Sequence, residues 1–271
     1  MLTLASDFGS PYPAAMKGVV LQHTDARLID VAHDLPRQDV RAAAFWCRET
    51  LPYFPPAVHL VVVDPGVGTD RDALVVRAGE HALVGPDNGV LLPAARRLAV
   101  DTDESVPVEC FVYDYADPAS STFHGRDVFA PAAAEVHEVG VDAVGSIDAV
   151  THAETFVAAD APETVVDCRF PEPTLDPSAN EARGEVLVVD DFGNAITNVP
   201  GSFLDGRAAD DIDVNGASAT VATAFADVPE GERLVTVGSH GYVECDVNRG
   251  RGDEAFDLAP GDDVRLSVFS R

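Results

Sequence analysis

The sequence predicts an α/β protein with a mostly parallel, doubly wound sheet in its first half and a small antiparallel β domain, a barrel or a sandwich, in its second half. In the first half, short apolar runs alternate with segments of helical spacing, and polar residues directly follow several of the runs. Strands and helices that alternate in this way form right-handed βαβ units, which build parallel sheets. In the second half, short strands are separated by glycine and aspartate turns, as in antiparallel barrels and sandwiches.

The stretch at 59–71, HLVVVDPGVGTDR, shows the strand pattern most clearly. Its apolar residues run straight into Asp64 and a Pro-Gly-Val-Gly turn, as expected for a strand buried on both faces. Open α/β sheets bind ligands beyond the carboxyl ends of their strands, which makes Asp64 a candidate site residue with Arg71 near enough to pair with it. The alternative is an aspartate that only caps its own turn.

The other elements of the first half follow in chain order. Strands are expected at 1–5, 28–32, 60–63, 74–77, 81–84 and 106–113, and helices at 14–23, 39–53, 91–98 and 128–139. The strands at 74–77 and 81–84 are expected to form a hairpin. The segment 120–127 contains serine, threonine and aspartate residues positioned to cap the last helix.

A proline-rich stretch divides the chain. Pro171, Pro173 and Pro177 lie within it and mark a linker. The sequence therefore predicts an N-terminal domain at 1–168, a linker at 169–180 and a C-terminal domain at 181–271. Strands of the C-terminal domain are expected at 184–190, 217–223, 233–237, 242–247 and 264–269.

The chain is strongly acidic. Its 271 residues carry a formal net charge of −28, from 46 acidic and 18 basic residues, and Lys17 is its one lysine. Such a surface repels the phosphates of nucleic acids and anionic membranes, so neither is expected as a partner. Apolar residues make up 46% of the chain, which argues against disorder. We expect this composition in a cell with a high-salt cytoplasm, such as that of a halophilic archaeon, and unfolding at low salt would test it.

Cysteine usage and hydropathy suggest a reducing compartment. Cys47, Cys110, Cys168 and Cys245 form no CxxC or Cys/His cluster, so we expect reduced thiols, without disulfides or a metal site. No apolar run is long enough for a membrane span, and the N-terminus begins in a strand without a signal peptide. We therefore expect a cytoplasmic protein.

Three further polar segments are candidates for chemistry. His124 lies where a loop becomes a helix and is either a base or a surface turn residue. The segment 190–198 is either part of a site or a polar turn between strands, and the segment 238–242 is either a hairpin loop or a nest of backbone NH groups that holds a carboxylate. The chain has no Gly-x-Gly-x-x-Gly after its first strand and no GKS/T, HExxH or GxSxG motif, which argues against the usual dinucleotide, nucleoside triphosphate, zinc protease and serine hydrolase functions.

Seven motifs occur along the chain in order. They are SDFG at 6–9, MKG at 16–18, VVDPGVGTDR at 62–71, PDNG at 86–89, TFHGRDVFAPAAA at 122–134, DDFGNAITN at 190–198 and SHGYVECDVNRG at 239–250. Taken together, they resemble the S-adenosylmethionine (SAM) hydroxide adenosyltransferase family, which is related to the fluorinase and chlorinase. Each motif alone is weak, but the ordered set covers both halves of the chain and is highly specific.

The resemblance implies a Rossmann-like N-terminal domain, a C-terminal β-barrel and a homotrimer whose pocket lies between the first domain of one subunit and the second domain of the next. It also implies roles for the residues that match the family motifs. Asp64, Arg71 and His124 match the triad assigned to water activation. The expected substrate-binding residues are Asp7 at the ribose hydroxyls, Asp190 and Ser239 at the amino and carboxylate ends of the methionine moiety, Asn194 at the adenine edge, and Phe123, Gly125 and His240.

The chemistry of SAM hydrolysis agrees with these residues. Attack at the ribose C5′ expels methionine as a neutral thioether, so the difficulty lies in activating water. His124, oriented through Asp64 and Arg71, is expected to supply the base, an effect worth ~10²–10⁴ in rate. No metal or organic cofactor is expected.

Two other functions stay open. Halide-using relatives carry a tyrosine where this chain has Asp64 and lack the equivalent of His124, which favours hydroxide, whereas Gly125 is shared with the chlorinase. A module that binds SAM or a nucleoside without chemistry is the alternative from a different class.

Departures from the family pattern concern the nucleoside contacts: the segment 9–12 is shorter than usual, Gln38 replaces a stacking aromatic, and His240 replaces a more usual aromatic or arginine.

Overall fold

The computed structural model describes residues 1–102, 106–116 and 118–269. The chain folds into two compact units, Met1–Arg169 and Phe170–Arg271, whereas the sequence places the end of the first domain at residue 168. Within the described ranges, no helix is both long and apolar enough to cross a membrane.

A largely parallel sheet forms the centre of the first unit, as predicted. Within its described residues the strand order is β2-β1-β3-β5-β4-β6-β7. The strands are β1 (Leu2–Ser6), β2 (Leu28–Ala32), β3 (Val58–Val62), β4 (Ala73–Ala78), β5 (His81–Pro86), β6 (Val108–Tyr113) and β7 (Val150–Phe156). Strands β2, β1, β3 and β5 pair in parallel, and β4 pairs antiparallel with β5 and β6. Strand β6 therefore runs in the direction of the parallel strands, and the predicted β4–β5 hairpin is confirmed.

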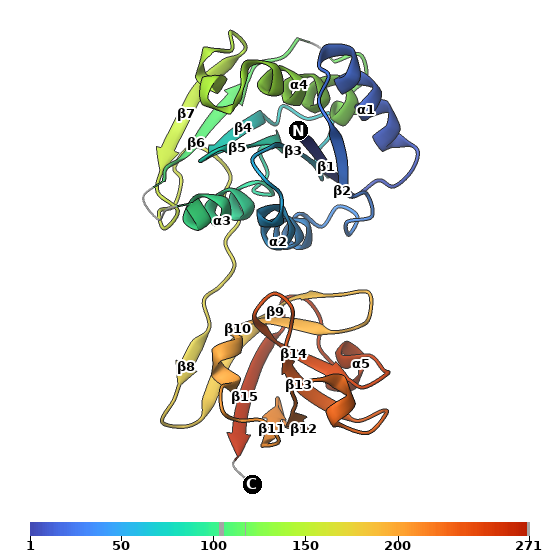
Figure 1. Ribbon diagram of the computed structural model, residues 1–271, viewed down its shortest axis with the longest axis vertical. Coiled ribbons are helices and arrows are strands. Elements are labelled where there is room, and N and C mark those ends of the chain that lie inside the picture. The colour runs from blue at the N-terminus through green and yellow to red at the C-terminus, as the bar shows by residue number, and fades with distance from the viewer. Residues whose placement is uncertain (103–105, 117, 270–271) are drawn as a thin grey trace. The chain divides into compact units, whose positions relative to one another are not determined.

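Helices cover both faces of this sheet. Figure 1 shows α1 (Tyr12–His23) and α4 (Ala130–Val139) over one face, and α2 (Val40–Thr50) and α3 (Leu92–Thr102) over the other. Strand β3 is buried at every position, which explains the apolar residues that follow His59 in the sequence. Helix α2 begins after Asp39, whose carboxylate accepts a hydrogen bond from the Ala42 amide at 2.9 Å, a side-chain cap of the usual kind.

The start of α4 differs from the prediction. A π-helical turn, η2 (Gly125–Phe129), leads into α4, and His124 precedes it without a capping hydrogen bond from its side chain. The hydroxyls of Ser120 and Thr122 instead lie 3.0 Å from each other, within their own loop. The predicted side-chain cap is therefore wrong. Single π-helical turns occur often at functional sites.

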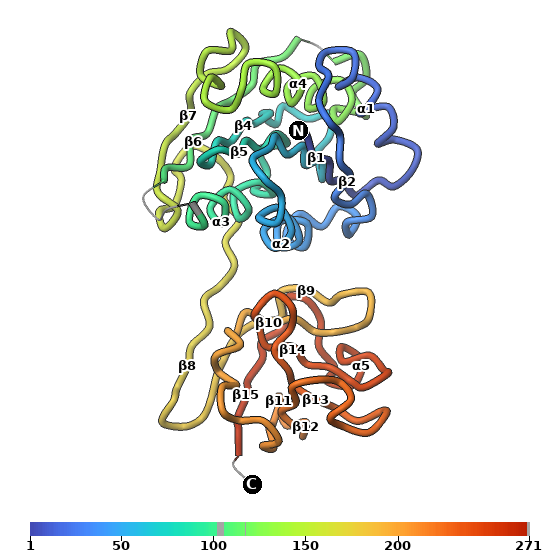
Figure 2. Tube along the Cα trace, in the orientation of Figure 1, coloured from blue at the N-terminus to red at the C-terminus, as the bar shows by residue number. Residues whose placement is uncertain are grey.

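The second unit is a closed β-barrel, which excludes the sandwich (Figure 2). Its strands are β9 (Glu181–Val189), β10 (Ala195–Pro200), β11 (Asp211–Val214), β12 (Ala217–Val221), β13 (Arg233–Val237), β14 (Tyr242–Val247) and β15 (Asp263–Phe269). They follow the order β10-β14-β13-β12-β11-β15-β9, and β9 pairs again with β10 to close the barrel. The pairs are antiparallel apart from β12–β13, which is parallel.

Several elements were not predicted. They are β7, β10, β11, the short strand β8 (Thr174–Asp176), the short helix α5 (Gly252–Phe256) and the 3-10 turns η3 (Val141–Ser146), η4 (Gly201–Leu204) and η5 (Phe225–Asp227). Strand β8 lies inside the expected linker at 169–180 and pairs with β9, so part of that stretch belongs to the sheet of the barrel. A further 3-10 turn, η1 (Leu51–Tyr53), continues α2 to the expected end of that helix.

Candidate active site

The candidate residues of the first unit lie beyond the ends of strands that share one direction. Asp7 directly follows β1, His33 directly follows β2, and Asp64 comes just after β3. Asn88 and Tyr115 come just after β5 and β6, which run the same way. Because the carboxyl ends of such strands lie along one edge, these side chains line the place where α/β sheets bind their ligands.

Asp64 and Arg71 form a direct ion pair. Arg71 Nη1 donates to Asp64 Oδ1 at 2.7 Å, and the amide of Gly66 donates to the same oxygen at 3.2 Å. The side chain of Asp64 is 7% exposed and that of Arg71 is 29% exposed. A Cβ atom on Gly66 would collide with the guanidinium, so this glycine allows Arg71 to fold back over the turn. Gly66 therefore supplies an amide donor to Asp64 and room for the Arg71 guanidinium.

His124 lies beside this pair. Burial raises the pKa of Asp64, while Arg71, the amide of Gly66 and the charge of His124 reduce that rise without removing it. His124 is 6% exposed, and its ring meets those of Tyr115 and Phe129 edge-on, with centroids 6.0 and 6.5 Å away. No hydrogen bond joins the His124 ring to another residue of the described chain. In the expected relay, Arg71 and Asp64 are therefore joined by a direct ion pair. Asp64 and His124 lie near each other without a hydrogen bond between them in the described chain.

A close contact brings together the loops that carry Asp64 and His124. Gly68 has a φ of 82°, and a Cβ atom there would lie 2.5 Å from the carbonyl oxygen of Ser121. Only glycine accepts both the positive φ and the short approach. The distance between the two loops therefore depends on this residue.

Replacing Gly68 by alanine is expected to separate the loops. We expect a loss of about 1–3 kcal/mol in the free energy of unfolding, and a fall of about 10-fold or more in turnover, because catalytic geometry tolerates little displacement. Urea unfolding and steady-state kinetics measure the two effects. Gly216→Ala is the matched control, because Gly216 also has a positive φ, 93°, but has no atom within 4 Å of its Cβ position. A Gly68→Ala protein with normal turnover would contradict a role for the contact.

Asp7 is held by the segment that follows β2. Its Oδ2 accepts a hydrogen bond from the amide of Gln38 at 2.7 Å, and Gln38 adopts a φ of 61° to make this contact. Asp7 is 9% exposed. A carboxylate has about four acceptor positions, so this arrangement leaves capacity for the paired hydroxyls of a ribose.

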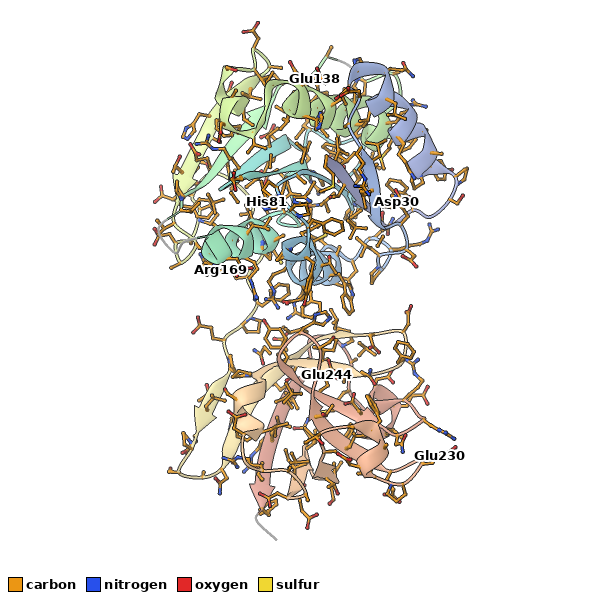
Figure 3. All side chains as sticks on the ribbon, in the orientation of Figure 1. Asp30, His81, Glu138, Arg169, Glu230 and Glu244 are labelled. Atoms are coloured by element: carbon orange, nitrogen blue, oxygen red, sulfur yellow. The ribbon has the colours of Figure 1, made fainter. Side chains whose placement is uncertain are left out.

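A chain of hydrogen bonds supports the strand end next to Asp7. Ser6 Oγ lies 2.7 Å from His33 Nδ1, and His33 Nε2 lies 3.0 Å from Asp30 Oδ1. Lys17 Nζ donates to Asp30 Oδ2 at 2.7 Å. Asp30 lies on β2, beside α1 in Figure 3. Lys17, the one lysine of the sequence, therefore links α1 to β2 through Asp30. His33 extends this link to the end of β1.

Phe123 and Gly125 are placed by packing on either side of His124. Phe123 meets Phe8 and Tyr12 edge-on, with ring centroids 5.9 and 5.5 Å away. A Cβ atom on Gly125 would lie 2.9 Å from the sulfur of Met16. A larger residue at position 125 would therefore displace its neighbours.

In the second unit, Asp190 closes the loop between β9 and β10. Its Oδ1 accepts the amides of Phe192 and Asn194 at 2.9 Å each, and its Oδ2 accepts Asn194 Nδ2 at 3.0 Å. Gly193 turns the chain with a φ of 88°. The segment forms a turn between strands, in which the two predicted binding residues, Asp190 and Asn194, bond to each other. Their role in substrate binding stays a prediction.

Ser239 and His240 lie in the hairpin loop between β13 and β14. The amide of Gly238 donates to the Tyr242 carbonyl at 2.8 Å, and the amide of Gly241 donates to the Gly238 carbonyl at 3.0 Å. Ser239 is exposed and His240 is half-buried. The segment forms the loop of this hairpin, and its role in holding a carboxylate stays a prediction.

Metal ligands do not gather among the described residues of either unit. Across residues 1–102, 106–116 and 118–269, no group of three or more histidine, cysteine, aspartate and glutamate side chains is arranged to hold a metal ion.

Family models match both halves of the chain. The SAM hydroxide adenosyltransferase N-terminal domain matches residues 2–145, and the SAM hydroxide adenosyltransferase C-terminal domain matches residues 184–265. The chain belongs to the SAM hydroxide adenosyltransferase family. The resemblance inferred from the ordered motifs is thereby confirmed.

Two curated relatives match nearly the whole chain and have the same name. A protein of Salinispora tropica named (R)-S-adenosyl-L-methionine hydrolase is 40% identical over 98% of this chain and 97% of its own length. A protein of Thermus thermophilus with the same name is 39% identical over 96% of this chain and 97% of its own length.

Solved structures share the fold along its whole length. The crystal structure of an uncharacterized conserved protein from Thermotoga maritima has a TM-score of 0.79 and 31% identity, and covers 98% of this chain and 100% of its own. A conserved hypothetical protein from Thermus thermophilus has a TM-score of 0.72 and 34% identity, with 99% of both chains covered.

Two residues beside the candidate triad were not predicted from the sequence. Asn88 Nδ2 donates to the carbonyl of Val63 at 2.8 Å, which fixes the backbone just before Asp64. Burial raises the pKa of Tyr115, and the charges of Asp72 and Asp64 add to this rise, so the phenol lies near the same carboxylates. The rule that ligands bind beyond parallel strand ends identifies both positions, because each follows such a strand.

Proposed function

We propose that the protein hydrolyses SAM to adenosine and L-methionine. The observation that carries this proposal is the buried Asp64–Arg71 pair with His124 beside it, in a chain of the SAM hydroxide adenosyltransferase family. The curated name of the relatives, (R)-S-adenosyl-L-methionine hydrolase, supports the same reaction.

In the proposed reaction, water attacks the ribose C5′ from the side opposite the sulfonium. The C5′–O bond forms as the C5′–S bond breaks, and the electron pair of the broken bond leaves with sulfur. Methionine departs as a neutral thioether and needs no acid, because the sulfonium is already an activated leaving group. The reaction therefore needs neither a metal nor an organic cofactor, and it inverts the configuration at C5′.

His124 accepts the proton of the attacking water. Its base catalysis is worth ~10²–10⁴ in rate. Asp64 stabilises the imidazolium that forms, and Arg71 holds Asp64 in place through their 2.7 Å contact. The developing hydroxide also meets the sulfonium cation, and opposite charges attract more strongly where water is excluded.

The residues proposed to bind the substrate come from both units. Asp7 binds the ribose hydroxyls, and Phe123 and Gly125 shape the pocket around His124. From the second unit, Asp190 and Ser239 hold the amino and carboxylate ends of the methionine moiety, and Asn194 contacts the adenine edge. His240, beside Ser239, completes the set of substrate-binding residues.

We further propose a homotrimer in which each pocket receives its second-unit residues from a neighbouring subunit. Light scattering gives the mass that tests it. The acidic composition supports a high-salt habitat and argues against nucleic acid and membrane partners. The scattered cysteines support a cytoplasmic location.

Incubation with SAM in ¹⁸O water tests the reaction. The expected result is one labelled oxygen in the 5′ hydroxyl of adenosine together with unlabelled L-methionine. Both epimers at sulfur are supplied, because the name of the relatives specifies the (R) form. A protein that binds SAM without product over hours would refute hydrolysis and leave a binding module, and chlorinated nucleoside at high chloride would indicate a halogenase.

A further inference from the structure

One short turn lies beside both ends of the loop that carries the Asp64–Arg71 pair. The loop spans residues 64–71, between β3 and β4, and the turn, PDNG at 86–89, begins at the end of β5. Strand β5 pairs in parallel with β3 and antiparallel with β4. The carboxyl end of β5 therefore lies next to the end of β3 and the start of β4, where the loop begins and ends.

Asn88 holds the backbone at the start of this loop. Its Nδ2 donates to the carbonyl of Val63 at 2.8 Å. The pairing of β3 with β5 ends at Leu60, and its pairing with β1 ends at Val62, so Val63 lies beyond both. Val63 is 0% exposed, and a buried carbonyl needs a donor. The side chain of Asn88 therefore continues the work of the sheet one residue before Asp64.

Asp87 holds the backbone at the other end of the loop. Its amide donates to the carbonyl of Asp72 at 2.9 Å, and Asp72 directly follows Arg71. The β4–β5 hairpin continues from there with the pair Ala73–Pro86. Adjacent residues of the turn thus fix both ends of the loop, and with them the separation of the backbone segments that carry the carboxylate and the guanidinium.

The Asn88 amide has one orientation in this turn. Its Oδ1 accepts the amide of Val90 at 3.1 Å, while its Nδ2 bonds the carbonyl of Val63. A rotation that exchanged the two atoms would place oxygen against a carbonyl and nitrogen against an amide N–H. Asparagine suits the position because it presents a donor and an acceptor on one short planar group.

The last segment of the first unit, 165–168, packs against the turn from outside. The amide of Val166 donates to Asp87 Oδ1 at 2.8 Å. Gly89 has a φ of 90°, and a Cβ atom there would lie 2.8 Å from the Cβ of Cys168. Glycine therefore permits a contact that any other residue would prevent.

Ion pairs anchor this segment to α3. Asp167 accepts Arg96 Nη1 at 2.7 Å and Arg96 Nη2 at 2.9 Å, and it accepts Arg169 Nε at 2.9 Å. Figure 3 labels Arg169 beside α3. The turn is therefore held between a strand end and an anchored segment, which makes it a fixed reference for the loop.

We propose that Asn88 is a positioning residue for the hydrolysis of SAM. Through the Val63 carbonyl, its side-chain amide sets the position of the Asp64 carboxylate relative to Arg71 and His124. The inference rests on the proposed function, because it gives Asn88 a part in that reaction. Asn88 acts through the backbone, without contact to the substrate or the attacking water.

The test begins with Asn88→Asp, which exchanges the donor nitrogen for an oxygen and keeps the acceptor for Val90. The expected result is a fall in kcat of about 10-fold or more with KM changed less than about twofold, because the loss falls on catalytic geometry. Asn88→Ala adds no charge beside the carbonyl and is expected to give the same split between kcat and KM. Adenosine formation measures both variants.

Asn215→Asp is the matched control for Asn88→Asp. Asn215, in the turn between β11 and β12, makes the same two kinds of bond: its Nδ2 donates to the Asp263 carbonyl at 2.9 Å, and its Oδ1 accepts the Arg265 amide at 2.8 Å. This control is expected to change neither kcat nor KM. Unchanged kcat in both Asn88 variants, or a rise in KM alone, would overturn the proposal.

A second comparison repeats Asn88→Asp in an Asp64→Asn background. If Asn88 acts through the Asp64 carboxylate, its replacement is expected to lower kcat by less than about twofold once that carboxylate is gone. A loss as large as in the wild-type background would mean that Asn88 acts independently of Asp64, which would also overturn the proposal.

Crystal structures of the wild-type protein and Asn88→Asp give a measurement that needs no turnover. The contact between Arg71 Nη1 and Asp64 Oδ1 is expected to lengthen beyond hydrogen-bonding distance in the variant. An unchanged contact would contradict the positioning role. Failure of the function is separate: wild-type protein that forms no adenosine loses the hydrolase, and the two crystal structures still decide whether Asn88 positions the pair.

Discussion

Replacing His124 by alanine is expected to lower kcat for SAM hydrolysis by ~10²–10⁴-fold with little change in KM. The variant removes the base and leaves the Asp64–Arg71 pair intact, because no hydrogen bond connects that pair to the His124 ring within the described residues. Ground-state binding depends on other groups, so the loss falls on the chemical step. Steady-state kinetics with adenosine detection measures it.

His152→Ala is the matched control for His124→Ala. His152 is exposed and bonds Thr155 at 2.8 Å on the edge strand β7, so its loss is expected to leave kcat unchanged. Free imidazole is expected to restore part of the turnover of the His124 variant. Wild-type turnover in His124→Ala would instead assign His124 to packing against Tyr115 and Phe129.

The fold was predictable where one physical cause determined the local pattern. Strand β3 is buried on both faces, so an apolar run from Leu60 onward marks it in the sequence. Strand β7 is a half-exposed edge strand whose sequence, VTHAETF, has little apolar content to distinguish it from a loop. Strand β10 carries Asn198 and Pro200, which are typical of turns. Tertiary hydrogen bonds satisfy the side chains of Thr197 and Asn198.

The candidate site was predictable only where its residues are close in sequence. Arg71 follows Asp64 within one short motif, so the sequence itself indicates their pairing. The approach of Gly68 to Ser121 has no local signature, because the two residues come from different loops.

Asp64→Asn is expected to lower kcat by about 10²-fold or more without lowering stability. Burial raises the pKa of Asp64 even with Arg71 beside it, so ionisation of this group is less favourable in the folded protein than in the unfolded chain. The contribution of Asp64 to stability therefore falls as pH rises from the ordinary aspartate pKa toward the raised value. The neutral amide removes this cost. Thermal unfolding at neutral pH is expected to give an equal or higher Tm for the variant.

A fall in Tm together with kcat would contradict that account, because it would make Asp64 a structural residue. The double variant Asp64→Asn, His124→Ala separates the remaining cases. Groups that act as a unit on one proton transfer give losses that do not multiply, so the double variant is expected to be about as slow as His124→Ala alone. Losses that multiply would mean that Asp64 acts directly on the water or the substrate, independently of the imidazole. The absence of a hydrogen bond between Asp64 and His124 in the described chain makes this distinction necessary, since their proximity is compatible with either arrangement.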